Sequence, residues 1–235
     1  MREWISGNGS DVCCSPDDFS AMRSLIIPKT VVHLAALTPL AFLLWQVWGV
    51  AKTGSDALGA DPVAEIEHRL GLWALRFLML TLAITPLRQL TGWSTLIRFR
   101  RMLGLYTFAY ASLHFAAYLG LDLRGYWGQV FEDITKRPYI TVGFLAWLLL
   151  VTLAVTSTSG WIRKLGRSWA RLHKAVYLIA VLAVLHFWWL VKSDVREPAV
   201  YAAIAALLLG WRAWKAWRRR QRLPAKVRTS PSTPA

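Results

Sequence analysis

The chain has 235 residues, 55% of them hydrophobic, and a mean hydropathy of +0.37. The hydrophobic residues gather in long runs, which excludes an ordinary soluble domain. The net charge is +15, but the basic residues lie in short loops between these runs and in the C-terminal region. That placement is typical of the cytoplasmic loops of membrane proteins and does not favour nucleic-acid binding.

Six apolar runs are each close to the roughly 20 residues that a spanning helix needs. In chain order they cover residues 30–50, 70–90, 102–121, 139–157, 170–191 and 198–214. Alternating ten-residue strands are absent, so the spans are expected to be helices. The sequence therefore predicts an all-α integral membrane bundle of six helices. The last run ends at Arg212, whose side chain is expected to snorkel to the interface.

The sequence outside the spans predicts three regions. Residues 1–27 are polar and are expected to form a disordered N-terminal extension. Residues 28–216 form the transmembrane domain, and residues 217–235 form a basic, then Pro/Ser/Thr-rich, cytoplasmic tail. Lys and Arg concentrate after the second, fourth and sixth runs, whereas the opposite loops hold most of the acidic residues. Both termini of this multi-pass protein are therefore predicted to be cytoplasmic.

Three of the five histidines, His114, His173 and His186, lie inside predicted spans. An ionisable side chain within a membrane is a functional hypothesis by default. His114 and His186 lie on different helices at similar depths in the outer half of the bilayer. Two such imidazoles can ligate one haem iron from both sides, which favours electron transfer. Covalent c-type attachment is excluded, because Cys-x-x-Cys-His does not occur. Structural contacts between helices are the alternative.

His173 shares the fifth predicted span with His186 but lies nearer the cytoplasmic side. Thirteen helical residues rise about 20 Å, which leaves room for a second, inner haem. The second ligand of such a haem is not evident, since Arg100 stands fourteen residues before His114 on the third span. A guanidinium is a poor metal ligand but pairs well with a haem propionate. Alternatively, His173 is an interfacial histidine that reaches the lipid headgroups.

Arg76 lies about six residues, or roughly 9 Å, inside the outer end of the second span. Its guanidinium either snorkels outward or pairs with a propionate of the outer haem.

Short motifs spread over residues 31–215 resemble one family. They are Leu58-Gly-Ala-Asp-Pro62, Ile84-Thr-Pro-Leu-Arg88, Ile97-Arg-Phe-Arg-Arg-Met-Leu-Gly-Leu105, Arg137-Pro-Tyr139, Thr156-Ser-Thr158 and Lys164-Leu-Gly with Leu172-His-Lys-Ala-Val-Tyr177. In this order they resemble the MsrQ (formerly YedZ) family of the bacterial periplasmic methionine sulfoxide reductase system. That family belongs to the ferric-reductase-like transmembrane group, which also contains the NADPH oxidases.

The resemblance implies b-type haem, one or two per chain, held by His114, His173 and His186. It implies electron delivery to a periplasmic molybdenum-containing methionine sulfoxide reductase subunit, from the quinone pool or a cytoplasmic flavin reductase. Some descriptions of the family include FMN, although no glycine-rich phosphate loop is present here. NADPH oxidases carry two histidines on the third helix. In this chain Arg100 stands at the position of one of them.

Together these features predict an electron-transfer subunit without a catalytic site of its own for methionine sulfoxide. The chain ends about twenty residues after its last span, so no C-terminal flavin or NADPH domain is expected. A stand-alone ferric-reductase-like protein or oxidase is one alternative. A membrane transporter with a histidine proton relay is another.

Overall fold

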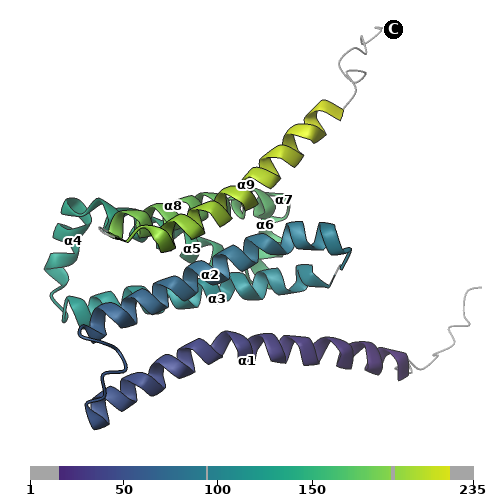
Figure 1. Cartoon of the computed structure of the whole chain (residues 1–235). Coiled ribbons are helices and arrows are strands. Elements are labelled where there is room, and N and C mark those ends of the chain that lie inside the picture. The colour runs from purple at the N-terminus through teal and green to yellow at the C-terminus, as the bar shows by residue number, and fades with distance from the viewer. Residues whose placement is uncertain (1–15, 94, 192–193, 223–235) are drawn as a thin grey trace, which may run out of the picture. The chain divides into compact units, whose positions relative to one another are not determined.

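The computed structural model describes residues 16–93, 95–191 and 194–222, in which every regular element is helical (Figure 1). The N-terminal and C-terminal ends of the chain, residues 1–15 and 223–235, lie outside the described residues. The elements in chain order are α1 (Pro16–Thr53), α2 (Pro62–Thr91), α3 (Leu96–Ala117), the π-helix η1 (Tyr118–Asp122), α4 (Trp127–Lys136), α5 (Pro138–Val155), α6 (Ser159–Leu165), α7 (Arg167–Leu172), α8 (Ala175–Leu190) and α9 (Arg196–Arg222).

Four segments of the described chain are long and apolar enough to cross a membrane. They are Lys29–Thr53, Pro62–Thr91, Pro138–Val155 and Arg167–Leu190. They coincide with the first, second, fourth and fifth predicted spans, so the prediction of an all-helical membrane protein is confirmed. The third and sixth predicted spans are helical as well, in α3 and α9, but they do not reach the same hydropathy. The count of six spans stays a prediction.

The described residues divide into two compact units, one that ends at Trp45 and one that begins at Gln46. Helix α1 begins at Pro16, within the stretch for which disorder was expected. Proline is favoured at the first position of a helix. The C-terminal tail was expected to begin at residue 217, but α9 continues to Arg222.

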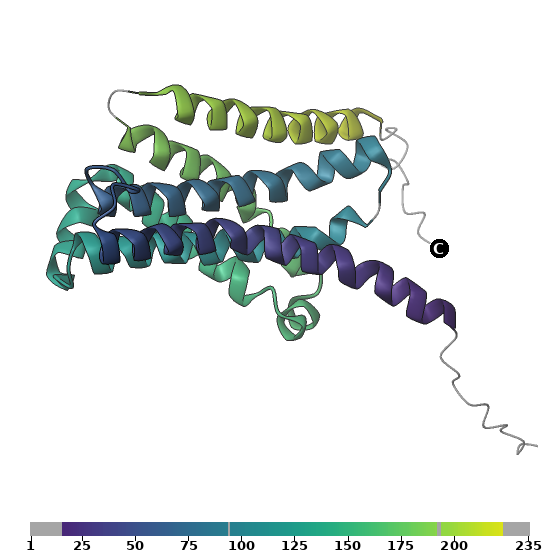
Figure 2. The same ribbon diagram turned by 60° about the horizontal axis from the view of Figure 1, so that its bottom comes forward.

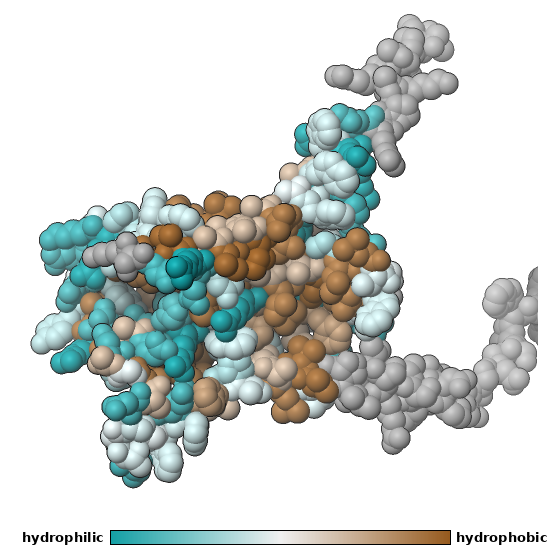
Figure 3. Space-filling model, viewed as in Figure 1, coloured by the Kyte–Doolittle hydropathy of each residue, from teal (hydrophilic) through white to brown (hydrophobic). Residues whose placement is uncertain are grey.

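The second unit is built around α2, which packs against α3, α8 and α9, while α5 packs against α3 and α8. Figures 1 and 2 show α2, α3 and α9 running lengthwise through this bundle. Its core contains Leu78, Leu82 and Ile179, which are at most 2% exposed. In Figure 3, hydrophobic side chains cover the middle of α9, and hydrophilic ones gather around α4 and over the far end of α9. An apolar band between polar ends suits a bilayer.

Proline inside α2 explains an unexpected contact with α9. Pro86 has no N–H, so the carbonyl of Leu82, four residues earlier, lacks its helical partner. The Arg212 guanidinium of α9 donates a hydrogen bond to that carbonyl and lies 5.3 Å from the centre of the Tyr177 ring. The expected snorkelling of Arg212 is therefore wrong, because the freed carbonyl binds the guanidinium within the bundle.

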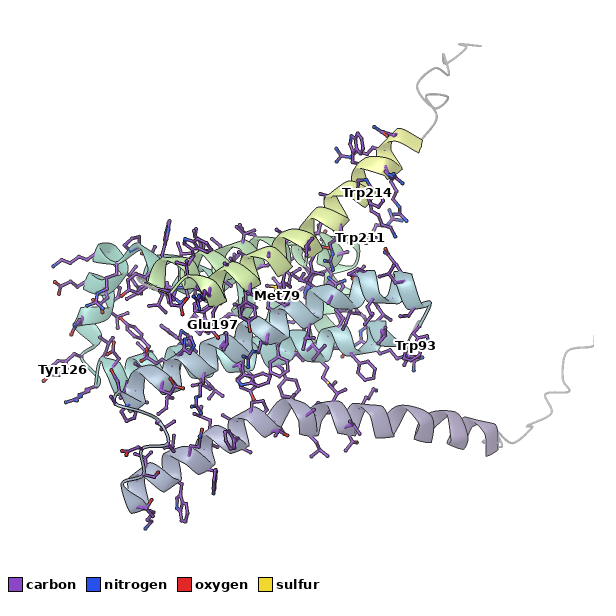
Figure 4. All side chains as sticks on the ribbon, viewed as in Figure 1. Met79, Trp93, Tyr126, Glu197, Trp211 and Trp214 are labelled. Carbon is purple, nitrogen blue, oxygen red and sulfur yellow. The ribbon has the colours of Figure 1, made fainter. Side chains whose placement is uncertain are left out.

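Aromatic side chains mark the two ends of the second unit. Figure 4 shows Tyr126, just before α4, at one end, and Trp93, just after α2, at the other. Trp214 of α9 lies toward the Trp93 end in the same view. Tyr126 is 73% exposed and Trp93 is 70% exposed. Exposed aromatic residues at both ends are typical of the two interfaces of a membrane.

A polar network fixes α4, a helix that the sequence did not predict. Tyr118 of η1 donates a hydrogen bond of 2.8 Å to Asp133, which is 5% exposed. Arg137 pairs with the other oxygen of Asp133 at 3.3 Å. A buried carboxylate needs such partners, because an unpaired charge is costly away from water. The network therefore fixes α4 to η1 and to the start of α5.

The Tyr118→Phe variant is expected to loosen α4, since it removes one hydrogen bond to a buried carboxylate. A cost of about 1–3 kcal/mol is typical of a bond to a charged group. Hydrogen exchange measures the effect: the backbone amides of α4 should exchange faster in the variant than in the wild type. Tyr126→Phe is the control at an exposed tyrosine. Unchanged protection of α4 in Tyr118→Phe would contradict the role of the network.

Candidate haem site

A cavity of about 240 Å³ opens between α2, α3, α5 and α8, with η1 and α4 at one end. Its lining is mostly apolar and aromatic, as is usual for a cofactor site. The polar side chains of the lining come mainly from the α4 end and include Glu67, His68, Asp122 and Arg137. His114 of α3 and His186 of α8 both line it as well.

The two histidine rings face one another across helices that are far apart in sequence. Their centroids lie 6.2 Å apart, and the ring planes cross at 76°. An imidazole nitrogen binds a first-row metal at about 2 Å, so two rings on opposite sides of one metal have centroids about 6 Å apart. The observed separation of His114 and His186 fits that requirement.

Each ring is also held in the tautomer that a metal needs. His114 Nδ1 lies 2.8 Å from the carbonyl oxygen of Glu67, and His186 Nδ1 lies 2.7 Å from that of Tyr139. A carbonyl only accepts hydrogen bonds, so Nδ1 carries the proton in both rings. The Nε2 lone pair is then left for iron, the arrangement usual for metal-ligating histidines.

The polar end of the cavity suits the propionate edge of a haem. Arg137 is the one arginine or lysine in the described lining. The hydrogen bond that it donates to Tyr139 raises the pKa of its guanidinium, so it stays cationic. Glu67 Oε1 is buried and has no hydrogen-bond partner among the described residues. The residues present therefore fit haem: two imidazoles, an apolar cavity and a cation at its polar end.

His173 lies in a different environment. It follows the end of α7 at Leu172, and α8 begins at Ala175, so a turn lies between His173 and His186 within the candidate span Arg167–Leu190. The amides of Val176 and Tyr177 bond three residues back, to His173 and Lys174, instead of four. These tight turn bonds interrupt the α-helix and change the angular relation between the two histidines.

The ring of His173 makes contacts of its own. It stacks on Trp169 with centroids 4.1 Å apart, and its Nε2 lies 3.2 Å from Thr156 Oγ1. The Thr156 hydroxyl donates its single proton to Thr152 O at 2.7 Å, so Nε2 is the donor to Thr156. Arg100 of α3 is a charged neighbour of His173. Ligation of an inner haem through Nε2 requires this hydrogen bond to open.

Arg76 is not among the residues that line the cavity. Its Nε donates a hydrogen bond of 3.0 Å to the Tyr201 hydroxyl of α9, and its guanidinium lies 4.7 Å from the Trp73 ring centre. The structure thus brings His114 and His186 together, places Arg100 near His173, and holds Arg76 on the α9 side of α2.

Sequence reasoning missed several residues of the cavity. Glu67 and His68 line the cavity but lie before the second predicted span, which begins at residue 70. Helix α2 begins at Pro62, eight residues before the apolar run, so its first turns belong to the cavity wall. Arg137 carried no signal except its place in the Arg137-Pro-Tyr139 motif. Gly71 and Gly143 carried none.

Comparison with known proteins identifies the class. Residues 70–184 match the family model of the ferric reductase like transmembrane component. The matched range contains His114 and His173 and ends two residues before His186.

Relatives over most of the chain identify the family within that class. A relative from Xanthomonas oryzae pv. oryzae (strain MAFF 311018) is 72% identical over 81% of this chain and 87% of its own length. One from Xanthomonas euvesicatoria pv. vesicatoria (strain 85-10) is 68% identical over 90% of this chain and 97% of its own length. One from Caulobacter vibrioides is 46% identical over 77% of this chain and 84% of its own length. Each is named protein-methionine-sulfoxide reductase heme-binding subunit MsrQ. The chain belongs to the MsrQ family, which confirms the resemblance found in the sequence.

Proposed function

We propose that the chain is the haem-binding membrane subunit of a protein-methionine-sulfoxide reductase system, and that His114 and His186 are the axial ligands of its b-type haem. The observation that carries the proposal is the pair of imidazoles, 6.2 Å apart on α3 and α8, with Nδ1 of each bound to a backbone carbonyl. When bound, the haem supplies a one-electron carrier.

The chain's own residues hold the cofactor and keep water from it. With a haem bound, His114 and His186 would hold the iron from both sides and would leave little room there for oxygen or a substrate. Leu75, Ile179 and Phe187 contribute to an apolar wall that lowers the local dielectric. Arg137 lines the polar end of the cavity and would pair with a propionate there in addition to Asp133, whereas Arg76 does not line the cavity.

The proposed direction of transfer rests on the orientation that the distribution of charge predicts and on the family's periplasmic acceptor. With both termini in the cytoplasm, the α4 end of the cavity faces the periplasm. The acceptor we propose is a periplasmic molybdenum-containing methionine sulfoxide reductase subunit. The donor is the quinone pool or a cytoplasmic flavin reductase, acting from the side of His173 and Arg100 in the bacterial inner membrane.

Purified full-length protein from haem-replete cells tests the proposal. The reduced form is expected to show the sharp bands of a low-spin b haem. It is expected to be reoxidised when a periplasmic methionine sulfoxide reductase subunit and methionine sulfoxide are added together, but not with either alone. A colourless protein would refute haem binding. A coloured protein that the partner never reoxidises would favour a stand-alone reductase.

The His173→Ala variant separates one haem from two. Because His173 Nε2 is engaged by Thr156, the variant is expected to keep the haem held by His114 and His186, with unchanged reduced bands and unchanged iron per chain. Iron and absorbance are measured on the same preparations as in the wild type. A fall to half the wild-type iron would instead show that His173 holds a second haem.

A further inference from the structure

The two histidines are held by the same local arrangement, repeated on two pairs of helices. In the pair α2 and α3, His114 bonds to the carbonyl of Glu67 and packs against Gly71. In the pair α5 and α8, His186 bonds to the carbonyl of Tyr139 and packs against Gly143. In both pairs, the residue that supplies the carbonyl comes four positions before the glycine and 47 positions before the histidine.

The spacing of four has a physical reason. In an α-helix, the amide of residue i+4 bonds to the carbonyl of residue i, so those two residues are neighbours on one face. A side chain at i+4 would cover that carbonyl. Glycine leaves the second lone pair of the carbonyl open, and the imidazole of the neighbouring helix fills the space.

The fit against each glycine is close. A Cβ built on Gly143 would lie 2.7 Å from His186 Nδ1 and 2.8 Å from its Cε1. A Cβ on Gly71 would lie 3.3 Å from the same two atoms of His114. Real Cβ atoms do not approach ring atoms within 3.0 Å, so a methyl group at Gly143 must displace the ring, while one at Gly71 only crowds it.

We propose that Gly71 and Gly143, with the carbonyls of Glu67 and Tyr139, are positioning residues that fix the rotation of the two haem-ligating imidazoles. This inference rests on the proposed haem site. The backbone carbonyl sets the tautomer of each ring, and the glycine surface sets its plane. Two such cradles on different helix pairs hold the planes at a crossing angle of 76°.

Electron paramagnetic resonance of the oxidised holoprotein reads that angle. Nearly perpendicular axial imidazole planes give a low-spin haem signal with a large maximum g value, whereas parallel planes give a smaller, rhombic one. Gly143→Ala is expected to abolish or shift the large-g signal and to weaken haem retention by about 10–100-fold, as changes around metal ligands do. Gly71→Ala is expected to shift the signal less.

Gly210→Ala in α9 and Gly104→Ala in α3 are the matched controls. A Cβ at Gly210 meets nothing within 4 Å, and one at Gly104 meets only a Thr81 methyl at 4.0 Å. Alanine is a better helix former than glycine, so all four variants are expected to gain helix propensity. A changed signal in Gly143→Ala and Gly71→Ala, but not in the two controls, with unchanged circular dichroism in all four variants, therefore reports a positioning role.

His186→Ala in the same series separates this inference from the proposed function. Wild-type haem content and an unchanged signal in Gly143→Ala, together with haem loss in His186→Ala, would overturn the cradle and leave the haem site intact. Retention of haem in His186→Ala would refute the haem site itself. If Gly143→Ala cannot be purified, Gly71→Ala decides: a shifted signal supports the cradle and a wild-type signal overturns it.

Discussion

His186→Ala and His114→Ala are each expected to remove the haem from the purified protein. The cavity offers the metal one imidazole from each side, so either substitution leaves a single axial ligand. Changes to groups around metal ligands typically cost about 10–100-fold in metal affinity, and loss of a ligand itself should cost more than that. Iron per chain and the reduced absorption bands measure the effect.

His33→Ala is the control for this pair, because His33 lies in α1 and does not line the cavity. It should retain the wild-type iron content and spectrum. If either His114→Ala or His186→Ala keeps the low-spin bands, the two histidines do not share one iron. Circular dichroism checks that each variant is folded, since an unfolded variant would lose haem for another reason.

Arg212→Met is expected to destabilise the bundle. The substitution keeps the length of the side chain but leaves the Leu82 carbonyl without its donor inside an apolar bundle. An unsatisfied buried carbonyl costs about 1–3 kcal/mol. The free energy of unfolding, measured by denaturant titration in detergent micelles, should fall by that amount. Arg218→Met is the control, since Arg218 is exposed and its guanidinium lies 4.0 Å from the centre of the Trp214 ring.

Pro86→Ala provides a stricter version of the same experiment. Alanine restores the N–H that proline lacks, so the Leu82 carbonyl regains a helical partner. Arg212→Met should then cost less in the Pro86→Ala background than in the wild type. The difference between the two costs is the coupling energy of a double-mutant cycle. Equal costs in both backgrounds would show that Arg212 does not serve the carbonyl that Pro86 frees.

The sequence was enough to predict the histidine pair. His114 and His186 are polar residues in apolar runs, and counting residues from the basic loops places them at similar depths. The helical fold and the family were predictable for similar reasons, since run length and motif order are local properties of the chain. The haem count, FMN and the electron donor stay predictions, because they came from the resemblance or from spacing alone.

The rest depends on contacts between distant segments. For Arg76 the sequence left two alternatives, snorkelling outward or pairing with a propionate. Its hydrogen bond to Tyr201, 125 residues away, could not be predicted from its depth. The break at His173 arises from turn bonds that hydropathy does not register. Gly71 and Gly143 carry no charge or chemistry, so their role becomes visible only once the rings of His114 and His186 are seen against them.

The repeated cradle has a consequence for how the protein is made. Each helix pair forms its own half of the site from residues within one stretch of chain: 67–114 in the first and 139–186 in the second. His186 is synthesised about 70 residues after His114, which at about 5–20 residues per second is a delay of several seconds. During that delay the first hairpin can enter the bilayer with its imidazole already oriented. If haem needs both imidazoles, as proposed, the chain would acquire it only after the second helix pair has been synthesised.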